Sequence, residues 1–346
     1  MALQELVRLV GGTASPYTQK MVALLRYRRL PYAVTWGQPA MVCDELGIDK
    51  PKPTFMPTFF FENDGETQAV CDTTPIIRRL EEMYPGRSVL PQDPALAFID
   101  YLIEDFADEW CTKYMFHYRW YLETDADNAG TLLPLGFDVS MPQEQLGEMK
   151  KWITDTQVGR LYVVGSNDTT APVIDASYRR FLSAMENHLA NQKFMLGGRP
   201  GAGDFGLYGQ LTQLVGFDPT PRNITHEVSP RTVAWVDHMH DQCGLEPDDQ
   251  DWVGLQDQPA SLRGLMEEIG RVYAPAQLAN ASAVQAGEKH WEAEINGERW
   301  TQPSFSYQAK CLQWTNERYR ALNEHDRALV DTLLQGTGVE TMLSLA

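Results

Sequence analysis

In the first quarter of the chain, short apolar runs alternate with stretches in which apolar residues recur at helical spacing. Residues 6–10 form a mainly apolar run that ends at two glycines, which predicts a buried strand entering a loop. Ser15 then precedes Pro16, a favoured pairing for the start of a helix, and apolar residues follow at helical spacing. Residues 32–36 predict a second strand, and residues 41–49 a short helix with a weak pattern.

A hairpin and a further helix complete this unit. Residues 58–61 and 69–71 are separated by the turn-forming Asn63, Asp64 and Gly65, which predicts two antiparallel strands with a somewhat extended loop. A helix is predicted to begin near residues 73–75 and to stop at a Pro-Gly pair. The predicted element order through residue 86 is β-α-β-α-β-β-α.

Long helices dominate from Asp93 onwards. Asp93 before Pro94 is a good helix start, and apolar stripes at helical spacing recur as far as about residue 245. The polar stretch 246–251 indicates a surface connection, and residues 290–300 predict a hairpin around an Asn-Gly turn. We therefore expect an α/β domain at 1–88, an all-helical domain at 89–245, and a partly helical C-terminal extension at 246–346.

Charge and cysteine usage narrow the possible partners. The 29 basic and 47 acidic residues give a net charge of −18, which disfavours binding to nucleic acid or to an anionic membrane surface. The five cysteines are scattered, odd in number and never spaced as C-x-x-C, so they predict neither a disulfide framework nor a zinc site. No signal-peptide pattern and no run of 18 apolar residues occurs, and we expect a cytoplasmic protein.

Five short motifs are distributed along the predicted domains. Three are in the first domain: S-P-Y-T at residues 15–18, M-P-T at 56–58 and D-T-T-P-I-I at 72–77. Two are in the helical region: G-R-P-G-A-G-D-F at 198–205 and S-P-R-T-V-A-W-V-D-H-M at 229–239. In their order and spacing, residues 6–240 resemble a serine-type glutathione transferase, with a thioredoxin-like N-terminal domain and an all-α C-terminal domain. The family has a capping serine or threonine where this sequence has Gly201.

The resemblance implies a glutathione site in the first domain. It assigns the catalytic role to Ser15 and glutathione binding to the backbone beside a cis Met56-Pro57 bond. Asp72 and Thr73 match the motif that holds the γ-glutamyl group, although both residues also suit a helix terminus. Many members carry a lysine just before the proline; here Lys52 lies further upstream and is the candidate for the glycyl carboxylate.

The chemistry expected of Ser15 is stabilisation of a thiolate. A cysteine thiol with a pKa of about 8.5 is only slightly ionised at neutral pH. A hydrogen bond to a charged group contributes about 1.5–3 kcal/mol and a helix N-terminus up to about 2 kcal/mol, while two pKa units correspond to about 2.7 kcal/mol. Ser15 and its helix therefore suffice without a metal. The alternative is that Ser15 only caps the helix; Tyr17 and Thr18 are lesser candidate hydroxyls.

Several other clusters have both a structural and a chemical interpretation. Aromatic residues 114–121 lie where the family forms its second-substrate pocket, so Tyr17, Tyr114 and Tyr118 are pocket candidates, with a packed core stripe as the alternative. The acidic residues Asp100, Glu104 and Asp108 recur every four positions and predict a solvated helix face. His238 and His240 diverge on a helix and do not predict a metal site. Cys71, beside Asp72, is interpreted as a small buried strand residue, with a place near the bound tripeptide as the alternative.

Two functions fit these patterns. The first is a glutathione transferase that uses glutathione as co-substrate, attacks a small hydrophobic electrophile, and forms a homodimer. The second is a non-catalytic glutathione-binding or interaction protein on the same fold. The extension after residue 245 has three open roles: to cover the active site, to complete a dimer interface, or to add a binding surface.

Overall fold

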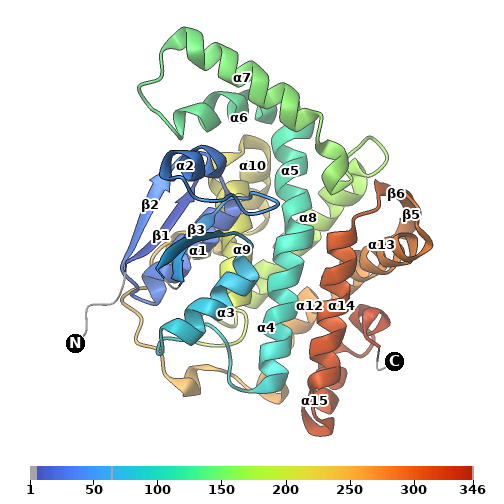
Figure 1. Cartoon of the computed structure of the whole chain (residues 1–346). Coiled ribbons are helices and arrows are strands. Elements are labelled where there is room, and N and C mark those ends of the chain that lie inside the picture. Colours follow the sequence, from blue (N-terminus) through green and yellow to red (C-terminus); the bar gives the residue numbers. More distant parts are fainter. Residues whose placement is uncertain (1–5, 64, 345–346) are drawn as a thin grey trace.

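The computed structural model describes residues 6–63 and 65–344 (Figure 1). Its first part is a four-stranded sheet with strand order β2-β1-β3-β4, in which β1 is parallel to β2 and antiparallel to β3. The strands are β1 (Val7–Gly11), β2 (Tyr32–Trp36), β3 (Thr58–Asn63) and β4 (Glu66–Val70). The helices between and after them are α1 (Pro16–Tyr27), α2 (Pro39–Leu46) and α3 (Thr73–Met83). The predicted β-α-β-α-β-β-α order is confirmed.

A long helical rod forms the centre of the second part. In Figure 1 it runs from α4 (Pro94–Phe106) through a π-helical turn at Ala107–Cys111 into α5 (Thr112–Tyr121). The remaining helices are α6 (Glu123–Leu135), α7 (Gln143–Val158), α8 (Ala171–Leu189), α9 (Ala202–Thr212), α10 (Pro219–Val228) and α11 (Pro230–Met239). The α1 helix of the first part packs against α9, which joins the sheet unit to the bundle.

The C-terminal extension is helical apart from one small sheet. Its elements are α12 (Ser261–Glu268), α13 (Ala274–Ala286), β5 (His290–Ile295), β6 (Glu298–Pro303), α14 (Ser306–Ala321) and α15 (Glu324–Leu334). The predicted hairpin is confirmed: Asn296 and Gly297 have φ values of 53° and 81°, the left-handed pair that a tight hairpin turn needs.

The extension packs against the bundle. Helix α12 lies on α8, while α14 and α15 lie along α4 (Figure 1). One cluster of buried apolar side chains extends from Val7 to Met342. Within it, Trp110 of the rod and Trp300 of the hairpin have ring centroids 5.3 Å apart.

The prediction of a solvated acidic face on the first long helix is wrong. Asp100 is 1% exposed and Glu104 is fully buried, because α4 is covered by α9 on one side and by the extension on another. Asp100 instead accepts hydrogen bonds from the backbone N–H groups of Ala202 and Gly203. Asp204 also caps the start of α9, because its Oδ2 accepts a hydrogen bond from the Gly201 N–H at 2.9 Å. Two carboxylates therefore satisfy the first turn of α9.

Candidate functional site

Ser15 is both a helix cap and a free hydroxyl donor. Its Oγ accepts a hydrogen bond from the Thr18 N–H at 3.2 Å, and its own N–H donates to the Gly12 carbonyl at 3.1 Å. A serine hydroxyl has one hydrogen to donate besides its acceptor sites. Within residues 6–63 and 65–344 no protein acceptor takes that hydrogen, and Ser15 is only half-buried. Capping and donation to a bound anion are therefore compatible.

Arg119 holds the loop that precedes Ser15. Its Nη1 donates to the Ala14 carbonyl at 2.9 Å, and its Nε donates to Asp218 at 2.9 Å. Its Nη2 donates to Gln213 Oε1 at 2.9 Å, and the guanidinium lies over the Phe217 ring. Burial raises the pKa of Asp218 to about 6, although Arg119 counteracts that rise. Sequence analysis missed this residue because its partners are about 100 positions away.

The segment before β3 has the geometry that the resemblance implies. The Met56-Pro57 bond is cis, and Lys52-Pro53 is a second cis bond that the sequence analysis did not predict. A Cβ atom placed on Gly12 would lie 3.4 Å from the Met56 sulfur and 3.5 Å from the Phe137 ring. Phe137 follows α6 and is a further residue that the sequence analysis missed. Lys52 is exposed beside this segment.

Asp72 adopts a strained backbone conformation at the start of α3. Its φ of 83° is unusual for a residue with a side chain, and such strain concentrates at functional sites. Its Oδ1 accepts the Thr74 N–H at 3.3 Å, and its Oδ2 accepts the hydroxyl of Tyr307 at 3.0 Å. Tyr307 belongs to the extension, 235 positions further along the chain.

Thr73 is buried, and its hydroxyl accepts a hydrogen bond from the Lys20 ammonium at 3.1 Å. The same ammonium bonds to Glu104 at 2.9 Å and to Asp108 at 2.6 Å. Glu104 is also paired with Arg78 at 2.8 Å. This network ties α1 and α3 to the rod beneath the candidate site, and it contains two of the three regularly spaced acidic residues, Glu104 and Asp108.

The pKa values in this network follow from burial and pairing. Burial alone would raise the pKa of Glu104, but the charges of Arg78 and Lys20 outweigh it and lower that pKa. Burial lowers the pKa of Lys20, yet its two carboxylate partners reverse the shift and raise it. Burial raises the pKa of Asp108 to about 6 despite the Lys20 charge, so the groups of the network are mainly ionised at pH 7.

The π-helical turn lies opposite the first turn of α1. Tyr17 donates its hydroxyl to the Asp108 carbonyl at 2.8 Å, a carbonyl on the widened turn. Widened turns of this kind are frequent at functional sites. Glu109 lies on the same turn, and burial, with Asp105 and Asp108 nearby, raises its pKa to about 8. The π-helical turn therefore fixes the position of Tyr17, whose hydroxyl hydrogen is donated to the Asp108 carbonyl.

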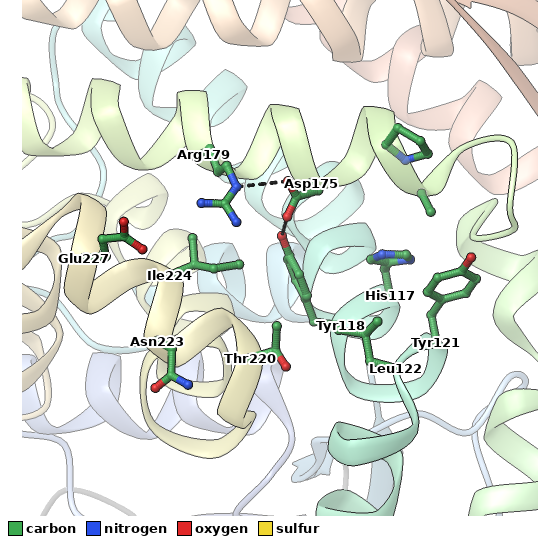
Figure 2. Close-up of a pocket in the computed structure, with 12 residues that line it drawn as sticks. His117, Tyr118, Tyr121, Leu122, Asp175, Arg179, Thr220, Asn223, Ile224 and Glu227 are labelled. Atoms are coloured by element: carbon green, nitrogen blue, oxygen red, sulfur yellow. Dashed lines mark hydrogen bonds and ion pairs between the residues drawn. The ribbon is translucent and has the colours of Figure 1, made fainter.

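The predicted second-substrate pocket needs correction. Tyr114 is fully buried and bonds to Ser177 and Trp110, so it is a core residue. Tyr118 lines a groove of about 470 Å³ between α5, α8 and α10, where its hydroxyl donates to Asp175 at 2.7 Å. Figure 2 shows Asp175 receiving both Tyr118 and Arg179 on the wall of this groove. Neither Tyr17 nor Tyr114 lines this groove, so it does not bring the three tyrosines together.

Neither a metal site nor a membrane-spanning helix is found in the described part of the chain. No group of three or more His, Cys, Asp or Glu residues is arranged to hold a metal ion there. His240 instead contacts Arg26 and the Tyr208 hydroxyl. No helix among the described residues is long and apolar enough to cross a membrane. The interpretation of Cys71 as a buried strand residue is wrong: it follows the end of β4 and is half-buried, and its thiol donates to the Pro53 carbonyl.

Two family models match the chain. Residues 9–88 match the glutathione S-transferase N-terminal domain, and residues 168–238 match the glutathione S-transferase C-terminal domain. The chain therefore has the glutathione transferase fold, a thioredoxin-like domain followed by a helical domain. Neither match reaches the extension. A comparison with curated proteins found no match.

Several solved structures are similar to this chain at low identity. A glutathione transferase family member from Pseudomonas fluorescens Pf-5, with two glutathione bound, is 14% identical over 77% of this chain and 94% of that chain, with a TM-score of 0.42. A Burkholderia graminis glutathione transferase, also with two glutathione molecules per subunit, is 14% identical over 77% and 89%, with a TM-score of 0.41. FzlA from C. crescentus is 15% identical over 67% and 92%, with a TM-score of 0.39.

Proposed function

We propose that this protein is a glutathione transferase in which Ser15 stabilises the thiolate of bound glutathione. The observation that carries the proposal is the Ser15 hydroxyl, which begins α1 and has a hydrogen with no protein acceptor among the described residues. The family-model match over residues 9–88 supports the placement of glutathione in this domain.

The expected binding mode uses three parts of the first domain. The N-terminus of α3 suits the α-carboxylate of the γ-glutamyl group, and the Asp72 carboxylate suits its ammonium. The Met56 N–H and C=O, exposed by the cis bond, are suited to pair with the cysteinyl backbone. Thr73 accepts from Lys20 through its hydroxyl oxygen and keeps its own hydrogen to donate. Lys52 is the expected partner of the glycyl carboxylate.

The reaction needs no metal and no protein nucleophile. The glutathione sulfur loses its proton to solvent, and the Ser15 hydroxyl and the N-terminus of α1 stabilise the resulting thiolate. The thiolate attacks a small hydrophobic electrophile, a C–S bond forms, and the leaving group departs with its electron pair. Met56 and Phe137 offer an apolar wall beside Gly12. We expect a cytoplasmic homodimer.

The test is turnover of 1-chloro-2,4-dinitrobenzene by wild type and Ser15→Ala, together with retention on immobilised glutathione. Loss of a hydrogen bond to the thiolate, about 1.5–3 kcal/mol, predicts about 10- to 100-fold slower turnover with retention preserved. Ser229→Ala is the matched control, because Ser229 also precedes a proline and caps α11 through the Thr232 N–H. Its turnover should equal that of the wild type.

The other outcomes are informative. Unchanged turnover in Ser15→Ala removes Ser15 from the mechanism. Retention without any turnover in the wild type supports the non-catalytic glutathione-binding alternative. No retention at all contradicts both.

A further inference from the structure

The start of α14 lies beside the start of α3, although the two helices are far apart in sequence. The contact is made by Tyr307, whose hydroxyl donates to Asp72 Oδ2 at 3.0 Å. Asp72 is the residue proposed above to receive the γ-glutamyl ammonium. The extension, which neither family-model match covers, therefore reaches the proposed binding site.

Contacts within the C-terminal extension set the position of Tyr307. Asn280 of α13 is 1% exposed and forms two hydrogen bonds with the backbone of Phe305, the residue before α14. Its Nδ2 donates to the Phe305 carbonyl at 2.9 Å, and its Oδ1 accepts the Phe305 N–H at 2.8 Å. The Tyr307 ring packs edge-on against Trp314, with centroids 6.0 Å apart. These contacts hold the Tyr307 hydroxyl within reach of Asp72.

The acceptor sites of Asp72 leave room for a ligand. Oδ1 accepts the Thr74 N–H of the helix cap, and Oδ2 accepts Tyr307. An ionised carboxylate has about four lone-pair sites on its two oxygens, so each oxygen can accept one more hydrogen bond. An ammonium group can therefore bind Asp72 while Tyr307 stays in place.

The surroundings keep Tyr307 a donor. Tyr307 is 45% exposed, but its hydroxyl lies against the Asp72 carboxylate. Desolvation of that hydroxyl, and then the charge of Asp72, raise its pKa. The next residue, Gln308, lies near Glu109 on the π-helical turn and counteracts part of the rise in its pKa. The first turn of α14 thus meets the site at two acidic residues, Asp72 on α3 and Glu109 on the rod.

We infer that Tyr307 is a positioning residue of the γ-glutamyl subsite, which fixes the Asp72 carboxylate so that it receives the α-ammonium of the ligand. The inference rests on the proposed function, since it assumes that glutathione binds at Asp72. It gives the extension a defined role: it favours thiol ligands that carry a free γ-glutamyl amino group.

The test compares two ligands by isothermal titration calorimetry on the full chain. One is glutathione, and the other is glutaryl-cysteinylglycine, which lacks only the α-amino group. Tyr307→Phe removes the hydroxyl and keeps the ring. Its Kd for glutathione should rise about tenfold, the size of one hydrogen bond to a charged group, while its Kd for the glutaryl ligand should equal that of the wild type.

Tyr319→Phe is the matched control. Tyr319 lies on the same helix and also donates to a carboxylate, Asp331, at 2.6 Å, but that partner is on α15. Its Kd values for both ligands should equal those of the wild type.

Four results overturn the inference. Unchanged glutathione binding in Tyr307→Phe excludes the role, and tighter binding shows that Tyr307 competes with the ligand. Equal weakening for both ligands shows a general structural effect. Failure of the wild type to bind glutathione removes the proposed function and the inference together, whereas the first three outcomes leave the proposed function standing.

Discussion

Lys20 and Lys113 are both buried lysines, yet they join different parts of the molecule to the helical rod and have opposite pKa shifts. Lys20 lies where the thioredoxin-like domain meets the rod, with Glu104 and Asp108 bonded to its ammonium. Burial alone would lower its pKa, but these two carboxylates raise it. Burial lowers the pKa of Lys113 to about 8, and Glu109 counteracts this only in part. Bonded carboxylates therefore decide in which direction the pKa of a buried lysine shifts.

Lys113 lies where the extension meets the rod, and its partners there are neutral. Its ammonium donates to the Gln302 side chain at 3.1 Å and to the Val164 carbonyl at 3.3 Å. It also lies between the Trp110 and Trp300 rings, 5.6 Å and 5.7 Å from their centroids. The first joint therefore depends on charge pairing, and the second on ring packing and on hydrogen bonds from an ammonium to neutral acceptors.

Removing the Lys20 charge, where the thioredoxin-like domain meets the rod, should have the largest effect on the free energy of unfolding. In Lys20→Met, Asp108 loses its ion-pair partner and Glu104 keeps only Arg78, so we expect the free energy of unfolding to fall by about 3–5 kcal/mol. Urea unfolding at pH 7 measures it. The control is Lys150→Met, which breaks an exposed pair with Asp127 and should cost less than about 1 kcal/mol. Equal losses in the two variants would contradict the comparison.

The second joint should show a distinctive pH dependence through Asp105. This carboxylate accepts the Tyr273 hydroxyl at 2.6 Å, and burial raises its pKa to about 7 despite that bond. Because the folded state then holds the proton more tightly, the free energy of unfolding should fall as pH rises from about 4 to about 7. One such group contributes up to about 1.4 kcal/mol per pH unit.

Asp105→Asn cannot titrate and should lose this contribution. Its free energy of unfolding, measured by urea titration at pH 5, 6 and 7, should decline less steeply than that of the wild type. Asp237→Asn, an exposed change on α11, should keep the wild-type slope. Parallel curves for Asp105→Asn and the wild type would count against a buried, protonated Asp105.

The smallest effect at neutral pH is expected at Lys113. Lys113→Met removes a buried ammonium without breaking an ion pair, so we expect a change of about 1 kcal/mol or less at pH 7. The folded pKa of Lys113 lies below its ordinary value, so the wild type should gain stability relative to the variant between about pH 8 and 10. Unfolding at pH 7 and pH 9.5 tests both points. A loss as large as that of Lys20→Met would refute the distinction between the joints.

Local signals in the sequence predicted the first domain and the hairpin well. Ser15 before Pro16, the cis Met56-Pro57 bond and the turn at Asn296-Gly297 depend on neighbouring residues or on the family resemblance, and the structure has them as predicted. These features need no knowledge of distant partners.

Features that depend on distant partners were not predicted. The spacing of Glu104 and Asp108 is the same whether water or Lys20 faces them, and Lys20 is more than 80 positions away. Tyr114 has the aromatic character of a pocket residue, but the rod is covered on several sides and buries it. Arg119 and Tyr307 likewise meet their partners only in the folded chain.

The pair formed by Trp110 and Trp300 gives the molecule a built-in optical probe. Their rings are 5.3 Å apart, close enough for their excited states to interact, and one lies on the rod while the other lies in the extension. Any event that lifts the hairpin from the rod separates them. The difference in near-ultraviolet circular dichroism between the wild type and Trp300→Phe therefore isolates a signal for docking of the extension, without any attached dye.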